Sequence, residues 1–172
     1  LERMAQEAPK FQYRSALARD MGADEAWMDN DSHTLTAKEA VLDAAFGGNG
    51  RARFTLAHEL GHYFLGHTGR RRRNPDKEVY AGAKERNQES EADLFASFFL
   101  VPTDLAMNAK NSEEISNRFQ VSLKAAEIAF ERIQAAKRRL SGEKRQSPGI
   151  VIDFLKEAKL RGLPIRSELP ED

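Results

Sequence analysis

The chain has 172 residues, 40% of them hydrophobic, so it is long enough to bury one core and short for two domains of ordinary size. Its 27 Lys and Arg residues balance its 27 Asp and Glu residues, which disfavours a protein that binds mainly nucleic-acid phosphates. It has no cysteine, so disulfide scaffolds, thiolate metal sites and thiol nucleophiles are excluded. No apolar run approaches the roughly 20 residues that span a bilayer, and the N-terminus lacks the apolar segment of a signal peptide. We therefore expect a cytoplasmic protein without a membrane partner.

The first 35 residues have the weakest secondary-structure pattern. Residues 1–21 are compatible with short helical pieces. Residues 26–28 and 33–36 are candidates for short strands, which predicts a small, weakly encoded sheet. A short helix is predicted over residues 36–47, because Thr36 can cap its N-terminus as part of a capping box.

The central part of the chain carries the strongest helical patterns. Apolar residues recur at helical spacing over residues 53–67, and a second such helix is predicted over residues 87–100. Between them, residues 66–74 form a loop rich in Gly and Arg, which is either a solvated charge run or a cationic rim that selects an acidic partner. Two further helices are predicted over residues 112–119 and 122–140, separated by a tight turn.

The motif with the clearest chemistry lies inside the first of these helices. Residues 58–62 read His-Glu-Leu-Gly-His, which is the HExxH pattern. Residues four apart share a helix face, so His58 and His62 can reach one ion while Glu59 lies where it can contact a metal-bound water. Two imidazoles and a carboxylate suit a tetrahedral zinc ion whose fourth position holds water.

The third ligand has to come from outside this motif. The extended pattern HExxHxxGxxH requires Gly at position 65 and His at position 68, but the chain has Leu65 and Thr68. His67 is one residue out of that register. We interpret His67 as a group beside a ligand or in the pocket wall, with an ordinary surface histidine as the alternative.

A glutamate on the following helix is the remaining source of a ligand. Glu85, Glu89 and Glu91 all lie within reach in the sequence. Glu89 is preferred because it stands four residues before Asp93 and shares a helix face with it, and Asp93 can then orient a metal-binding histidine through its free ring nitrogen. Glu91 points to another side of the helix and is the alternative ligand.

Several segments together resemble the ImmA/IrrE family of zinc metallopeptidases. These are RFTLAHELGH at 53–62, LGH at 65–67, ESEADLFA at 89–96 and FLVP at 99–102. Residues 115–133 resemble the usual continuation of that family. The resemblance implies a zincin-like single domain with an active-site HExxH helix, a Glu-bearing second helix and a small sheet.

The resemblance also implies roles for individual residues. It implies that His58, His62 and Glu89 bind Zn²⁺ and that Glu59 is the general base of a gluzincin-type endopeptidase. It further implies a protein substrate, a helix-turn-helix transcriptional repressor cleaved in bacterial stress responses or by mobile elements.

Peptide hydrolysis also needs a group that stabilises the oxyanion formed during attack. Three residues near the motif or in the loop that follows it are candidates, namely His67, Tyr63 and Tyr80. The sequence does not choose among them.

The order of the elements predicts an α+β fold that is predominantly α. We expect residues 1–140 to form the zincin-like domain, with a helix-turn-helix-like pair at 112–140. Residues 141–172 are predicted to be a C-terminal extension. It begins with a polar stretch, continues as a helix or a strand and helix over residues 150–160, and ends in a mobile tail.

Two other functions compete with the peptidase hypothesis. The helices at 112–140 have the outline of a DNA-binding module, but the second helix offers Lys124, Glu127 and Glu131, a mixed rather than a basic face. The other alternative is a zinc-binding protein that acts through protein interaction without hydrolysis.

Overall fold

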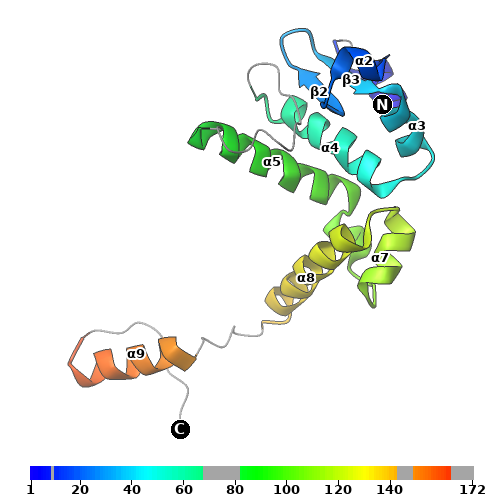
Figure 1. Cartoon of the computed structure of the whole chain (residues 1–172). Helices are drawn as coiled ribbons and strands as arrows, with labels where there is room; N and C mark the ends of the chain where they lie inside the picture. Colours follow the sequence, from blue (N-terminus) through cyan, green and yellow to red (C-terminus); the bar gives the residue numbers. More distant parts are fainter. Residues whose placement is uncertain (9, 68–81, 143–148, 164–172) are drawn as a thin grey trace. The chain divides into compact units, whose positions relative to one another are not determined.

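The computed structural model describes residues 1–8, 10–67, 82–142 and 149–163, and the structural statements below concern these residues. The chain divides into two compact units, Leu1–Ala135 and Ala136–Asp172 (Figure 1). Within the described residues, no helix is both long and apolar enough to cross a membrane. The predicted mobile tail and most of the Arg-rich loop lie outside the described residues.

The first unit is mostly helical and contains one small sheet, so the predicted α+β class is confirmed. In chain order its elements are α1 (Glu2–Glu7), β1 (Gln12–Ala16), α2 (Ala18–Met21), β2 (Ala26–Asp29), β3 (Thr34–Lys38), α3 (Glu39–Phe46), α4 (Gly50–Phe64), α5 (Ala83–Leu100), α6 (Thr103–Ala106), α7 (Ser112–Phe119) and α8 (Leu123–Leu140), the end of which belongs to the second unit. In the second unit, the predicted segment at 150–160 is a helix, α9 (Gly149–Leu160).

The sheet has three strands in the order β1-β3-β2. β1 runs parallel to β3, and β2 runs antiparallel to it with Met28 opposite Leu35. The strands predicted at 26–28 and 33–36 are thus confirmed with small shifts. The helical prediction for the residues of β1 is wrong, because this strand leaves most of its side chains exposed and lacks the apolar alternation that marks a half-buried strand.

The predicted start of the third helix is also wrong. Thr36 lies in the middle of β3, where it is buried and pairs with Trp27 of β2, so it cannot cap a helix. α3 begins only at Glu39, after Lys38. A β-branched threonine on a strand next to another buried strand is held by the sheet, and that packing outweighs the local capping signal.

α4 lies between the sheet and α5 (Figure 1). Its side chains Leu56 and Leu60 belong to the N-terminal hydrophobic core, which also contains Phe11, Met28 and Leu35. The helix begins at Gly50, three residues before the apolar pattern does, because the Asn49 side chain accepts a hydrogen bond of 3.0 Å from the Ala52 N–H.

On its other side α4 approaches α5 closely at Gly61. A Cβ on Gly61 would lie 3.0 Å from the Ala92 Cα and 3.1 Å from its carbonyl oxygen. Ala92 and Ala96 are completely buried. Small residues at the crossing thus bring α5 next to the HExxH residues.

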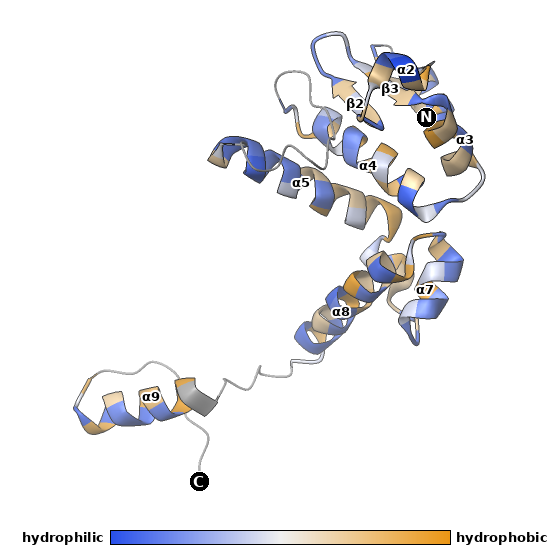
Figure 2. Cartoon of the chain, in the orientation of Figure 1, coloured by the Kyte–Doolittle hydropathy of each residue, from blue (hydrophilic) through white to orange (hydrophobic). Residues whose placement is uncertain are grey.

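A second core is formed where α6, α7 and α8 meet. Ile115, Val121 and Ile133 are among its buried residues. Figure 2 shows hydrophobic and hydrophilic residues in alternating patches along α8, as expected for an amphipathic helix. The helices predicted at 112–119 and 122–140 are confirmed as α7 and α8.

Candidate metal centre

The two histidines of the HExxH motif are buried side by side on α4. His58 and His62 are 2% and 1% exposed, and their Nε2 atoms lie 3.1 Å apart. The i, i+4 spacing on a helix accounts for this, because it places the two rings next to each other on one face of the helix. Both Nε2 atoms face the carboxylate of Glu89 on α5.

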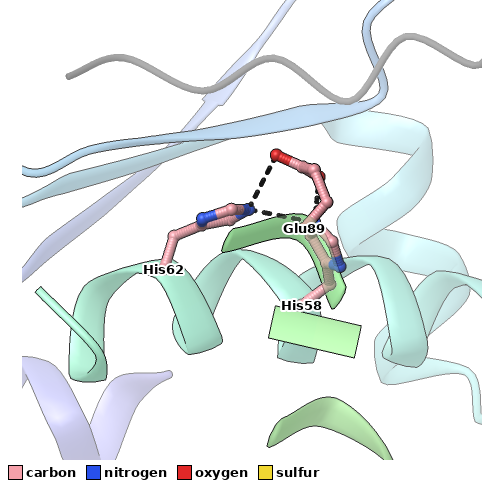
Figure 3. A group of neighbouring side chains, drawn as sticks. All are labelled: His58, His62 and Glu89. Atoms are coloured by element: carbon pink, nitrogen blue, oxygen red, sulfur yellow. Dashed lines mark hydrogen bonds and ion pairs between the residues drawn. The ribbon is translucent and has the colours of Figure 1, made fainter. Parts of the chain in front are cut away.

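Glu89 of α5 completes the group. Its Oε2 lies 3.1 Å from the Nε2 of His58, and its Oε1 lies 3.5 Å from the Nε2 of His62. One ligand atom from each of the three residues lies within 4.8 Å of the others (Figure 3). Two imidazole nitrogens and a carboxylate oxygen that converge in this way match the donor set of a catalytic zinc ion, so these residues fit the metal that the sequence predicts.

Asp93 lies one helical turn after Glu89 and contacts the other ring nitrogen of His58. The distance from its Oδ1 to the His58 Nδ1 is 2.8 Å. With the carboxylate as acceptor, the proton of His58 is on Nδ1 and the lone pair of Nε2 faces Glu89. This is the contact expected from the spacing of Glu89 and Asp93.

Glu91, the alternative ligand, is not brought into the group. Its Oε2 lies 3.1 Å from the Nε2 of His67. The Nδ1 of His67 in turn lies 2.8 Å from the Nδ1 of His62. His67 is 4% exposed, so its interpretation as a surface histidine is wrong, and it occupies the predicted place beside a candidate ligand.

Glu59, the candidate general base, is held by the sheet. It is buried, and its Oε2 accepts a hydrogen bond of 2.8 Å from the backbone N–H of Met28 in β2. A backbone donor of a strand does not rotate as a side chain does, so this bond gives the carboxylate a fixed orientation beside the two histidines.

The oxyanion candidates lie in different surroundings. The ring of Tyr63 packs against Phe11 and His33, with ring centroids 5.2 and 5.9 Å apart. Both ring nitrogens of His67 already have partners in His62 and Glu91. Tyr80 lies outside the described residues.

The protonation of the group suits metal binding. Burial lowers the pKa of His62 below its ordinary value. Burial alone raises the pKa of Glu89, but the close contacts of its carboxylate with the rings of His58 and His62 outweigh burial and hold that pKa well below its usual range. At neutral pH the structure therefore favours a neutral His62 and an ionised Glu89, the forms that bind a metal ion.

Two residues near the centre were not predicted from the sequence. Met28 contributes its backbone N–H to Glu59, and the Nδ2 of Asn30 donates to the carbonyl oxygens of His62, at 2.8 Å, and of His67. Each contact joins residues about thirty positions apart and depends on the packing of β2 against α4. No local sequence pattern signals it.

The turn between α7 and α8, the helix-turn-helix-like pair, contacts α4 of the same unit. The Nη1 of Arg53 in α4 donates to the carbonyl oxygens of Phe119 and Gln120 at 2.7 and 3.0 Å. A Cβ on Gly50 would lie 2.6 Å from the backbone nitrogen of Ser122. The turn is thus packed against the start of α4, which gives this pair a structural role in the same unit as the metal centre.

An HExxH helix, a glutamate on the next helix and a small sheet along the first helix together define a zincin-like domain with a candidate metal site. The family profile described as "Peptidase_M78: IrrE N-terminal-like domain" matches residues 32–131, more than half of the chain. The chain belongs to this ImmA/IrrE family of metallopeptidases. A comparison with curated proteins found no match.

Proposed function

We propose that this protein is a zinc-dependent endopeptidase of the gluzincin type that acts in the cytoplasm on a regulatory protein, such as a helix-turn-helix repressor. The observation that carries the proposal is the convergence of His58, His62 and Glu89 next to Glu59. Membership of a metallopeptidase family supports a protein substrate. The repressor and its place in stress responses or mobile elements rest on the family resemblance alone.

In this proposal His58, His62 and Glu89 hold the ion. Zinc held by these residues would supply Lewis-acid chemistry, which polarises a carbonyl group and lowers the pKa of water. Glu59 takes a proton from the attacking water and then delivers it to the leaving amine. The Met28 N–H keeps the Glu59 carboxylate oriented for both transfers.

The test combines metal content with cleavage. Elemental analysis of the wild type, Glu89→Gln and Glu91→Gln should give about one zinc per chain in the first and third proteins, and markedly less in Glu89→Gln. Glu59→Gln should keep its zinc and lose cleavage of a purified helix-turn-helix repressor by about 100-fold or more, measured by mass spectrometry of the fragments.

The contrary outcomes are specific. Loss of zinc in Glu91→Gln with retention in Glu89→Gln would show that Glu91, and not Glu89, is the third ligand. A wild type that binds zinc but cleaves no repressor, or cleaves it equally well as Glu59→Gln, would favour a zinc-binding protein that acts by interaction. A wild type that takes up no zinc would refute the metal centre.

A further inference from the structure

The turn that ends α4 determines where His67 lies. α4 ends at Phe64, and Gly66 has a φ of +66°, in the left-handed region where glycine is favoured. The His67 N–H then bonds the His62 carbonyl at 3.0 Å, and the Gly66 N–H bonds the Tyr63 carbonyl at 3.2 Å. This pair of bonds is the Schellman motif, in which the residue after the glycine folds back against the helix residue five positions earlier.

In most Schellman motifs the two residues that meet are apolar. Here they are His62 and His67, whose ring centroids are 4.9 Å apart. Asn30 fixes the arrangement from the loop after β2, because its amide group donates to the carbonyl oxygens of both histidines. The position of the His67 ring is therefore determined by backbone bonds as well as by its own ring contacts.

The hydrogen bonds of the rings form a chain with one consistent direction. For Nε2 of His62 to bind a metal it must carry a lone pair, so the proton of His62 is on Nδ1 and is donated to Nδ1 of His67. His67 then has its proton on Nε2 and donates it to Oε2 of Glu91. Each hydrogen bond in this series, from His62 through His67 to Glu91, thus has one donor and one acceptor.

We propose that His67 and Glu91 are positioning residues that hold His62 in the tautomer and orientation needed to bind the metal. This inference rests on the proposed metal centre. It assigns the two histidine ligands different supports, because His58 is oriented directly by the Asp93 carboxylate and His62 through an intervening imidazole. It also gives Glu91 a function other than that of a ligand.

The experiment measures zinc affinity by competition with a chromogenic chelator. Removal of a group that orients a ligand typically weakens metal binding by about 10- to 100-fold. We expect a loss of this size in His67→Leu, which has no acceptor for His62, and a smaller loss in Glu91→Gln, whose amide oxygen still accepts. Glu127→Gln, which removes the same charge from an exposed position on α8, should match the wild type.

His67→Asn separates positioning from general packing. The short amide of asparagine places an oxygen near the position of the His67 Nδ1, so this variant should recover most of the affinity lost in His67→Leu. In zinc-loaded protein with ¹⁵N-labelled histidine, the Nδ1–H resonance of His62 should be visible in the wild type and in His67→Asn, and should disappear in His67→Leu. Thermal melting of the metal-free proteins verifies folding. If His67→Leu does not fold, the zinc affinities of Glu91→Gln and His67→Asn relative to the wild type still test the proposal.

The inference is overturned if folded His67→Leu binds zinc as tightly as the wild type, or if His67→Asn is as weak as His67→Leu. In both cases one zinc per wild-type chain, lost in Glu89→Gln, would leave the proposed metal centre intact. Complete loss of zinc in Glu91→Gln with retention in Glu89→Gln would instead make Glu91 the third ligand, which overturns the positioning role of Glu91 and replaces Glu89 in the proposed metal centre.

Discussion

At the scale of single residues, burial sets the protonation of His62. The His62 ring is almost fully removed from water, which disfavours its charged form and lowers its pKa. In the unfolded chain this histidine returns to its ordinary pKa of 6.5. The unfolded state therefore binds a proton at pH values where the folded state does not, and acid favours unfolding.

This predicts the pH dependence of the metal-free protein. Its free energy of unfolding should fall as the pH drops below about 6.5, because protons bind His62 in the unfolded chain first. Glu89 acts in the same direction at lower pH, since a lowered carboxyl pKa stabilises the fold until the carboxylate is protonated. Urea unfolding at pH 8, 7, 6 and 5 measures the effect. His62→Gln should show a smaller change, and a rise in stability from pH 7 to 5 would contradict the prediction.

Several residues of the centre follow from sequence spacing alone, and others do not. The i, i+4 rule on two helices is enough to pair His58 with His62 and Glu89 with Asp93. The position of His67 is also signalled in the sequence, by the glycine that precedes it at the end of the helix. The register of the extended zinc motif does not take this glycine into account. A glycine just after the last helical turn predicts a left-handed cap, and the residue after that glycine is the one that folds back.

At the scale of elements, the close crossing of α4 and α5 depends on a glycine, Gly61, at the point of contact. Gly61 lies against Ala92, and Ala92 is flanked on α5 by the helical turn that carries Glu89 and Asp93. A methyl group at position 61 would meet the backbone of α5 rather than the tip of a side chain. The helix would have to move by a few tenths of an ångström, and the carboxylates of Glu89 and Asp93 would move with it.

We therefore expect Gly61→Ala to weaken zinc binding by about 10-fold or more, the size of effect seen when groups around a metal are displaced. The folding stability of the metal-free protein should change by no more than about 1 kcal/mol, because the helix propensity gained by alanine offsets part of the strain. Chelator competition and thermal melting measure the two quantities. Ser90→Ala, an exposed change on α5, is the control. Unchanged zinc affinity in Gly61→Ala would show that the crossing tolerates the methyl group.

The elements that sequence patterns predict well are those whose apolar face is regular. α7 and α8 belong to this class. β1 does not, because its pairing with β3 uses backbone groups and leaves its side chains largely exposed. The start of α4 was misplaced because its first turn, Gly50 to Ala52, has no apolar periodicity and is held instead by the Asn49 cap and by close packing against Ser122.

At the scale of the whole molecule, the residues of the metal centre and of both hydrophobic cores lie in the first unit, Leu1–Ala135. The family profile also ends within it, at residue 131. We propose that the peptidase domain is complete by residue 140 and that 141–172 is a C-terminal extension.

A chain truncated after Gly142 tests this organisation, because it keeps all of α8 and removes the segment that contains α9. We expect it to fold, to bind one zinc per chain with the affinity of the full chain, and to retain Glu59-dependent cleavage. Circular dichroism, elemental analysis and the repressor assay give the three results. Loss of zinc or of folded structure would show that the extension is an integral part of the domain.

The bond between Glu59 and Met28 also satisfies a buried backbone donor, because Met28 is 0% and Glu59 1% exposed. β2 is an outer strand, so its outward N–H groups have no strand partner, and one that is buried without an acceptor costs free energy. Glu59 covers one of these groups. Glutamine at position 59 still offers an oxygen to Met28, whereas alanine would leave that N–H open. Glu59→Gln is therefore the appropriate inactive variant for trapping a substrate, because it removes the base without leaving a buried backbone donor unpaired.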